Sequence, residues 1–194
     1  MRLFIGVELS DDLRNRAGTL AARLRRDAER AAPEAVVRWV ETGNLHITVW
    51  FFGEVREPQD QALLAALQSS LSVAPFSLRL SGAGAFPPSG PPRSLWLGLA
   101  EGRDGLFAVH DALRDRLAPL GFQPEGRAYS PHLTIARVKD VQKDDGATLR
   151  RLLRETSDDV GACDVRHATL FRSRTTPAGS RYEVLRRIEL RASA

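Results

Sequence analysis

Two short segments of the chain carry a histidine and a threonine two residues apart. They read HIT over residues 46–48 and HLT over residues 132–134. Side chains of an extended strand alternate between its two faces, so each histidine shares a face with its threonine and the apolar residue between them faces the other way. Histidine transfers protons near neutral pH, and a neighbouring hydroxyl can stabilise developing negative charge. Each segment therefore contains the parts of an acid–base site.

We call this pattern a His-x-Thr unit, and a third copy stands at His167 and Thr169. The first two units lie about half a chain length apart, which suits one unit in each of two lobes. The third follows the second too closely to belong to another complete lobe, so we interpret it as lying outside the site. His110 falls beside a helical apolar stripe and is expected to be a packing histidine. The spacing is equally compatible with His46 and His132 being ordinary strand histidines satisfied by local hydrogen bonds.

Regular alternation also places the neighbours of the first unit. It puts Ile47, Val49 and Phe51 on a buried face, and it puts Trp50 and Phe52 on the face of His46. There the two aromatic rings would either stack on a base or pack between the lobes.

The second unit has two uncertain neighbours. In a regular strand Arg137 points away from His132, whereas a bulge or a twist near the strand end would turn it inward as a phosphate clamp. Tyr129 precedes the strand and either lines the cleft or packs.

The surrounding sequence alternates strand-like and helix-like segments. Ser10 is a typical helix N-cap, and Pro33 ends the helix that it begins. This order predicts an α+β protein made of two sheet-plus-helix lobes, folded as one bilobal domain over residues 1–194. The expected strands are 2–9, 36–40, 46–53, 76 onward, 94–99, 132–138, 164–172 and 181–191; the expected helices are 11–32, 58–71, 104–117 and 147–155; 82–93 is expected to be a loop, and TTPAGS (175–180) a hairpin connection.

The composition is that of a globular protein, with 43% hydrophobic and 27% charged residues. It contains neither a long apolar run nor a signal peptide pattern, so we expect a cytoplasmic protein with no membrane contact. Cys163 is the only cysteine, which excludes an intrachain disulfide, and it is best read as a small buried strand residue.

The charge pattern permits a nucleic-acid partner without requiring one. The formal net charge is +4, and lysine occurs only at 139 and 143, so arginine supplies nearly all of the 28 basic residues. Arginine suits bidentate contacts to phosphate. There is no H-E-x-x-H motif, cysteine cluster, acidic metal loop or phosphate-binding glycine loop, so we expect no metal, no cofactor and no use of ATP.

The segments HITVWFFG and HLTIAR resemble the two signature strands of the 2H phosphoesterase superfamily. Further segments are similar to its bacterial RNA 2′,3′-cyclic phosphodiesterase branch, the LigT-like or ThpR family once called 2′-5′ RNA ligases. Val49 stands where that family more often has leucine. The resemblance covers nearly the whole chain, and its other segments are FIGVEL, WVETGNLHIT, FPPSGPPRSLWLGL, YSPHLTIAR, LFRS and YEVL.

The resemblance implies two pseudo-symmetric lobes around a central cleft, each a mainly antiparallel sheet with helices on its outer face. It implies that water opens a 2′,3′-cyclic phosphate at an RNA end to leave a 2′-phosphate. His46 would be the proton donor and His132 the acceptor, an order that the residues alone leave open. Thr48 and Thr134 would bind the phosphoryl oxygens. The reverse reaction would join RNA ends through a 2′-5′ linkage without ATP.

Two alternatives to this function stay open. One is another 2H branch that acts on small cyclic nucleotides. The other is a catalytically silent RNA-binding module, which the presence of two complete His-x-Thr units disfavours, because binding alone would need arginines rather than two titratable imidazoles. We expect a monomer in either case.

Overall fold

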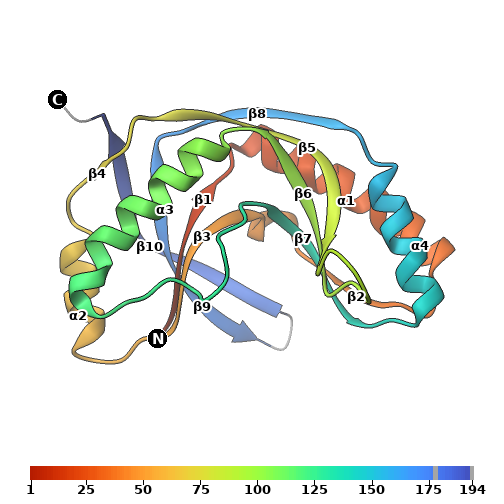
Figure 1. The fold of residues 1–194 in the computed structure, drawn as a ribbon, viewed down its shortest axis with the longest axis horizontal. Helices are drawn as coiled ribbons and strands as arrows, with labels where there is room; N and C mark the ends of the chain where they lie inside the picture. Colours follow the sequence, from red (N-terminus) through yellow and green to blue (C-terminus); the bar gives the residue numbers. More distant parts are fainter. Residues whose placement is uncertain (177–178, 193–194) are drawn as a thin grey trace.

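The computed structural model describes residues 1–176 and 179–192, and its strands join in one mixed α+β fold (Figure 1). The sheet order is β4-β10-β9-β1-β3-β7-β6-β5-β8, with β2 paired to β7. Its strand pairs are antiparallel apart from β10 with β4. The predicted α+β class with a mainly antiparallel sheet is therefore confirmed. The strands are β1 (Arg2–Glu8), β2 (Val36–Trp39), β3 (His46–Glu54), β4 (Leu71–Ser72), β5 (Phe76–Phe86), β6 (Ser94–Glu101), β7 (Leu133–Asp140), β8 (Asp159–Val165), β9 (His167–Thr176) and β10 (Gly179–Arg191); the helices are α1 (Asp11–Ala31), α2 (Gln59–Ala66), α3 (Arg103–Leu117) and α4 (Lys143–Arg154), with 3-10 turns η1 (Thr42–Asn44) and η2 (Ala118–Leu120).

The sheet narrows at its middle, where β3 meets β7. Within the described residues these two strands share one register pair, Ile47 opposite Leu133. On one side of this join lie β1, β3, β4, β9 and β10, which we call lobe 1. On the other side lie β2, β5, β6, β7 and β8, which we call lobe 2. The first two His-x-Thr units therefore meet at the boundary of the lobes.

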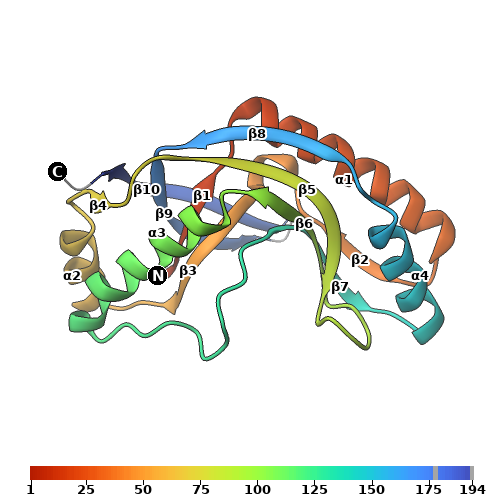
Figure 2. The same ribbon diagram turned by 45° about the horizontal axis from the view of Figure 1, so that its top comes forward.

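The lobes are not the two halves of the chain. The first-half strand β2 pairs with β7, and the C-terminal strands β9 and β10 join β1. The helices cross as well: α1 follows β1 yet packs against β8 and α4, and α3 follows β6 yet packs against β3 and β4 (Figure 2). Because β1 needs hydrogen-bonding partners on both edges, it takes β3 on one side and β9 on the other, whatever their distance in sequence.

The longest helix forms for the reasons that its sequence suggests. The Ser10 hydroxyl accepts a hydrogen bond from the Leu13 amide at 3.3 Å, which caps a first turn containing Asp11 and Asp12. The helix buries a stripe of apolar residues at helical spacing, most of which continues the core of β1 and β3. This stripe is Leu13, Ala17, Leu20, Leu24 and Ala28, extended by Ala21.

Several element boundaries differ from the prediction. The strand expected over 164–172 is two strands, β8 and β9, separated at Arg166, and α4 begins at Lys143 rather than at 147. The second helix ends at Ala66, and Leu71 instead belongs to β4, where it pairs with Leu190 of β10. The glycine-rich segment from Gly82 to Phe86 continues β5, because its backbone pairs with β6, so the loop is confined to 87–93. The N-cap of α3 is Gly102, with Asp104 in the first turn.

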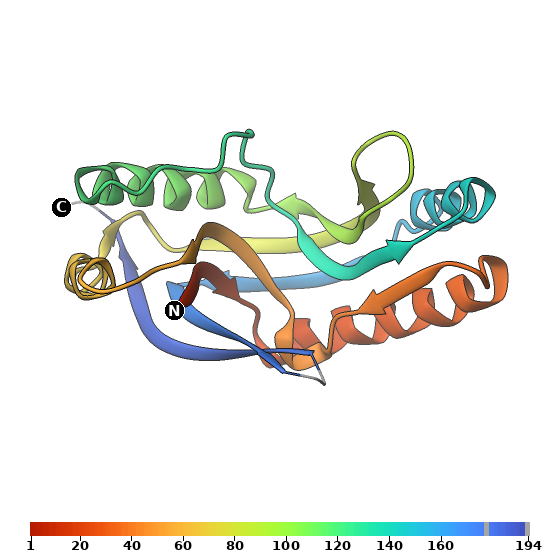
Figure 3. The same cartoon turned by 90° about the horizontal axis from the view of Figure 1, so that it is seen from below.

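Three smaller features complete the fold. The TTPAGS connection contains residues 177–178, which lie outside the described residues, while its flanking strands β9 and β10 pair as a hairpin (Figure 3). Cys163 is half-buried in β8. Among the described residues, no helix has the length and apolar character needed to cross a bilayer.

Candidate active site

The first two His-x-Thr units lie on adjacent central strands. His46 begins β3, and His132 directly precedes β7. Ile47 and Leu133, the middle residues of the units, pair with one another and are fully buried. Extending this antiparallel register brings His46 beside Thr134 and His132 beside Thr48. The four polar side chains thus share one side of the sheet, which we call the site face, around an approximate two-fold axis.

Both histidines make the same backbone hydrogen bond. The Nδ1 atom of His46 lies 2.7 Å from the carbonyl oxygen of Asn44, and that of His132 lies 2.7 Å from the carbonyl oxygen of Ser130. A carbonyl oxygen only accepts, so Nδ1 carries the proton in each ring and Nε2 has the lone pair of the neutral form. Nε2 of His46 lies 3.1 Å from the Thr48 hydroxyl. Each imidazole is therefore fixed in the tautomer that lets Nε2 exchange protons with a ligand.

The third unit has a different environment. Thr169 is fully buried, and its hydroxyl donates to a Glu8 carboxylate oxygen at 2.7 Å. The same carboxylate binds the guanidinium of Arg187 at 2.8 and 3.1 Å. His167 is exposed beside this ion pair in a polar hollow, and the described part of the chain gives its ring no hydrogen bond. The hydroxyl of Thr169 is therefore engaged in a structural hydrogen bond and does not face a ligand beside its histidine.

A β-bulge follows the threonine of each central unit. In β3, Ile5 pairs with Trp50 and Gly6 with Thr48, which leaves Val49 without an opposite residue. In β7, Leu95 pairs with Ala136 and Trp96 with Thr134, which leaves Ile135 in the same situation. An extra residue shifts the alternation by one position, so the side chains that follow it change face, as far as the next irregularity of the strand.

The first bulge overturns the predicted faces of two aromatic residues. Trp50 is 3% exposed and packs beside His110, with ring centroids 5.3 Å apart. Phe51 is 38% exposed and comes to the face of His46, with the Arg2 guanidinium 5.4 Å from its ring centroid. The prediction that Trp50 shares a face with His46 is therefore wrong, because it assumed a regular strand.

The second bulge resolves the orientation of Arg137. Regular alternation would turn Arg137 away from His132, but the unpaired Ile135 restores it to the site face, where it is exposed. Its positive charge lowers the pKa of both His46 and His132. Arg137 thus lies within electrostatic reach of both imidazoles.

The electrostatic environment favours neutral histidines in the unliganded protein. Burial is the main cause that lowers the pKa of His46, opposed by its hydrogen bond to Asn44 and assisted by Arg137. Burial also lowers the pKa of His132, opposed by the Ser130 hydrogen bond and assisted by both Arg137 and Arg127. His132 therefore faces one more cation than His46 does.

Aromatic rings surround each histidine differently. His46 packs against Phe4 and Tyr182, with ring centroids 4.8 and 5.1 Å away. Gly6 leaves room for this imidazole, since a Cβ atom there would lie 3.1 Å from His46 Cδ2. In lobe 2, His132 meets the edge of Phe86 at 4.9 Å, with Trp96 at 6.3 Å.

Two contacts connect the catalytic candidates to more distant segments. The Tyr129 hydroxyl donates to the Thr48 carbonyl oxygen at 3.2 Å, while its ring stacks on His110 at 4.6 Å. Burial raises the pKa of Tyr129, so this phenol stays protonated and able to donate.

The Asn44 amide donates to the Ser180 carbonyl oxygen of β10 at 2.8 Å. Tyr129 is a candidate from the sequence, whereas Asn44 is not, since its only signal is its position two residues before His46.

No group of three or more histidine, cysteine, aspartate or glutamate side chains is arranged to hold a metal ion in residues 1–176 and 179–192. The polar atoms available at the site are thus imidazole nitrogens, hydroxyls and guanidinium groups. This set can move protons and bind an anion.

A family model described as the 2′-5′ RNA ligase superfamily matches residues 9–177. An RNA 2′,3′-cyclic phosphodiesterase of Methanocaldococcus jannaschii is 32% identical over 96% of this chain and 99% of its own length. The protein of the same name from Escherichia coli K12 is 32% identical over 70% of this chain and 71% of its own. The relatives thus include archaeal as well as bacterial proteins.

Solved structures share the whole fold. A protein of Thermus thermophilus is 27% identical, with a TM-score of 0.73 and full coverage of both chains. E. coli LigT in complex with 3′-AMP is 26% identical, with a TM-score of 0.69 over 97% of each chain. The match extends across both lobes and so includes the join at which the two units meet.

Proposed function

The chain belongs to the 2′-5′ RNA ligase superfamily, and on that premise we propose that it hydrolyses RNA 2′,3′-cyclic phosphate ends to 2′-phosphates, with His46 and His132 as acid and base. Relatives that carry the name RNA 2′,3′-cyclic phosphodiesterase support the reaction. The observation that carries the residue assignment is the pair of matched 2.7 Å bonds from Nδ1 to a backbone carbonyl. These bonds leave the Nε2 atoms of both rings on one face of the sheet, on either side of the register pair Ile47 and Leu133.

The reaction needs two proton transfers. His132 Nε2 takes a proton from water as the water oxygen bonds to phosphorus, and His46 Nε2 gives a proton to the departing 3′ oxygen as the P–O3′ bond breaks. The bound phosphodiester is an anion, so it raises the pKa of nearby imidazoles and allows His46 to enter the reaction protonated. Both transfers use side chains, so the proposed reaction requires no metal or cofactor.

The charge distribution supports this order of donor and acceptor. A general base must be neutral before the reaction, and Arg137 and Arg127 both disfavour the charged form of His132. His46 is disfavoured as a cation by Arg137 but not by Arg127. Burial, the main cause of the lowered pKa, acts on both rings, so the acid is assigned on charge alone, to the histidine with fewer cationic neighbours.

The order can be tested with a cyclic substrate whose bridging 3′ oxygen is replaced by sulfur. A thiolate leaves without protonation, so this substrate is expected to restore turnover to His46→Ala but not to His132→Ala. Rescue of His132→Ala alone would reverse the two roles.

The threonines and Arg137 are proposed to stabilise the phosphoryl oxygens. Thr48 is exposed and Thr134 half-buried, and each shares the site face with both histidines. Their hydroxyls donate from the two strands, while Arg137 offers a planar pair of N–H donors from β7. Negative charge that builds on the phosphoryl oxygens is then stabilised by hydrogen-bond donors from both lobes.

The same arrangement would accept the 5′ hydroxyl of a second RNA in place of water. The O5′–P bond would form as the P–O3′ bond breaks, and the protons would follow the same route. This gives a 2′-5′ linkage without ATP, and it is the ligation that the superfamily name describes.

The proposed hydrolysis is tested with a short RNA that ends in a 2′,3′-cyclic phosphate, incubated in EDTA. We expect turnover and a 2′-phosphate product, identified by phosphorus NMR. A 3′-phosphate product would contradict the assigned leaving group. Activity that vanishes in EDTA and returns with a divalent cation would contradict the metal-free chemistry.

A further inference from the structure

Two arginines stand directly opposite one another on neighbouring strands of lobe 2. The register of β2 and β7 pairs Arg38 with Arg137, and both side chains are exposed. Directly opposite residues of an antiparallel pair have Cβ atoms about 5 Å apart and point to the same face. Arg38 thus extends the site face from Arg137 to β2.

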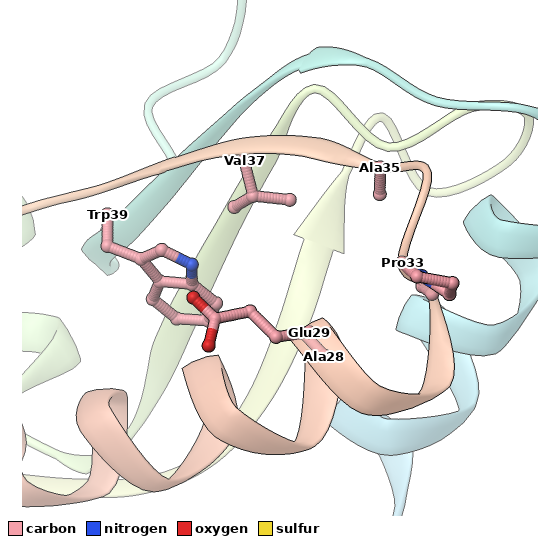
Figure 4. A pocket seen from close by; sticks show the side chains of 7 residues that line it. Ala28, Glu29, Pro33, Ala35, Val37 and Trp39 are labelled. Carbon is pink, nitrogen blue, oxygen red and sulfur yellow. The ribbon is translucent and has the colours of Figure 1, made fainter.

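The neighbours of Arg38 confirm the face on which it lies. Val37 and Trp39 point toward α1, where they line a hollow with Ala35 and Glu29 (Figure 4). Because strand side chains alternate, Arg38 points away from α1 and toward the site face. The hollow itself lies on the opposite side of β2 from the histidines.

The arginine pair is not neutralised within the protein. Many arginines of the described residues pair with carboxylates, such as Arg187 with Glu8 at 2.8 Å and Arg23 with Asp158 at 2.6 Å. Neither Arg38 nor Arg137 has a carboxylate oxygen within 4.0 Å in residues 1–176 and 179–192. Like charges directly opposite on a sheet destabilise it, and an anion bound between them would remove that cost.

We propose that Arg38 and Arg137 bind the backbone phosphates of the RNA strand attached to the reacting nucleotide, leading it from His132 to β2. This inference rests on the proposed function. A cyclic phosphate occupies the 3′ end of its strand, so the rest of the RNA continues from the 5′ side of that nucleotide. Arg137, near both imidazoles, lies between the reacting phosphoryl group and the first backbone phosphate of the strand, and Arg38 contacts that backbone phosphate from β2. The arginine pair thereby selects RNA ends over free cyclic nucleotides.

The proposal is tested by comparing Arg38→Gln with Arg26→Gln. Arg26 is an exposed arginine of α1, so both variants lose one surface charge, but only one loses it beside β7. For Arg38→Gln we expect KM on a cyclic-ended RNA hexamer to rise about tenfold, the equivalent of one charge-assisted contact. We expect the rate on a cyclic mononucleotide to stay within about twofold, because it lacks the second phosphate.

Salt dependence gives a second measure. Each lost phosphate contact on a single strand should reduce the slope of log affinity against log salt by about 0.7. This is measured with a hexamer ending in a 2′-phosphate, a product that binds without turnover, so the binding test holds even if the hydrolysis proposal fails. An unchanged hexamer affinity and slope in Arg38→Gln, or equal losses on hexamer and mononucleotide, would overturn the arginine-pair proposal. Matching thermal unfolding of both variants establishes that the fold is intact.

Discussion

The strands β3 and β7 carry nearly the same local structure with different surroundings. Each presents a His-x-Thr unit, a 2.7 Å bond from Nδ1 to the carbonyl two residues earlier, and a bulge directly after the threonine. The bulge brings the fifth residue after each histidine to the site face. At this position the two strands differ, since β3 has Phe51 and β7 has Arg137. The common backbone provides two equivalent proton carriers, whereas the flanking side chains make them unequal.

This comparison suggests how one site can contain both an acid and a base. Identical imidazoles in identical settings would have similar proton affinities and no defined roles. Here Phe4 and Tyr182 pack on His46, and Arg137 acts on both rings, whereas Arg127 acts on His132 alone. The backbone symmetry therefore sets the geometry, and the charge asymmetry is proposed to set the direction of proton transfer.

The largest expected effect comes from removing either imidazole. We predict that His46→Ala and His132→Ala each lower kcat on a cyclic-ended RNA by about a thousandfold, because each deletes one proton transfer. His167→Ala is the matched control, since His167 is exposed and lacks the carbonyl bond of the other two. Its activity should stay within about twofold of the parent. A large loss in His167→Ala, with little change in either of the others, would mean that the wrong pair of units has been chosen.

The threonines should produce the next largest effect. We predict that Thr48→Val and Thr134→Val each lower kcat about a hundredfold by removing one donor to the phosphoryl group. Thr48 also touches Nε2 of His46 at 3.1 Å in the unliganded protein, so only Thr48→Val should change the titration of its own histidine. Histidine titration by NMR measures this difference. Equal titration shifts in both variants would remove this distinction between the strands.

Much of this site follows from the sequence, and the side chains whose faces do not follow from it have one common cause. The spacing of the first two units indicates one per lobe, and local alternation puts each histidine with its threonine. Alternation fails after Thr48 and Thr134, because a bulge arises from pairing with another strand and leaves no local mark. The bulges that the sequence does not reveal explain both the wrongly predicted face of Trp50 and the two orientations left open for Arg137.

Which strands make up each lobe could not be predicted from the sequence either. The sequence order suggests that each half of the chain forms one lobe of a single domain, but β9 pairs with β1 and β2 pairs with β7. Strand partners are decided by hydrogen bonding and burial across the whole chain. The contact between Asn44 and Ser180 depends on this long-range assembly, and so no local pattern could predict it.

Removing a single cation should shift a single limb of the pH profile. Arg127 lowers the pKa of His132, so Arg127→Gln should raise that pKa and move the acidic limb of kcat/KM to higher pH. The alkaline limb, assigned to His46, should remain in place. Arg137→Gln should raise the pKa of both histidines and shift both limbs upward. If Arg127→Gln moves the alkaline limb instead, His132 is the acid and the proposed direction is reversed.

The smallest effect should come from the residues whose carbonyl groups hold the rings. Asn44 and Ser130 occupy equivalent positions, but the Asn44 side chain is also bonded to Ser180 at 2.8 Å, linking His46 to the hairpin of β9 and β10. Asn44→Ala keeps the carbonyl and loses this link, so kcat should fall a few-fold while KM changes little. The cost in stability should be about 1 kcal/mol, typical of one hydrogen bond.

Ser130→Ala is the matched change in lobe 2. It preserves the carbonyl that holds His132, and no hydrogen bond of the Ser130 hydroxyl is found in residues 1–176 and 179–192, so activity should be unchanged. Nitrogen-15 shifts of the imidazoles separate positioning from a general loss of stability: Asn44→Ala should perturb His46 Nδ1 and leave His132 as it was. A uniform change in both rings would show that Asn44 supports the fold as a whole. An unchanged His46 signal with normal kcat would show that the carbonyl alone positions the ring, so that the two strands hold their histidines in the same way after all.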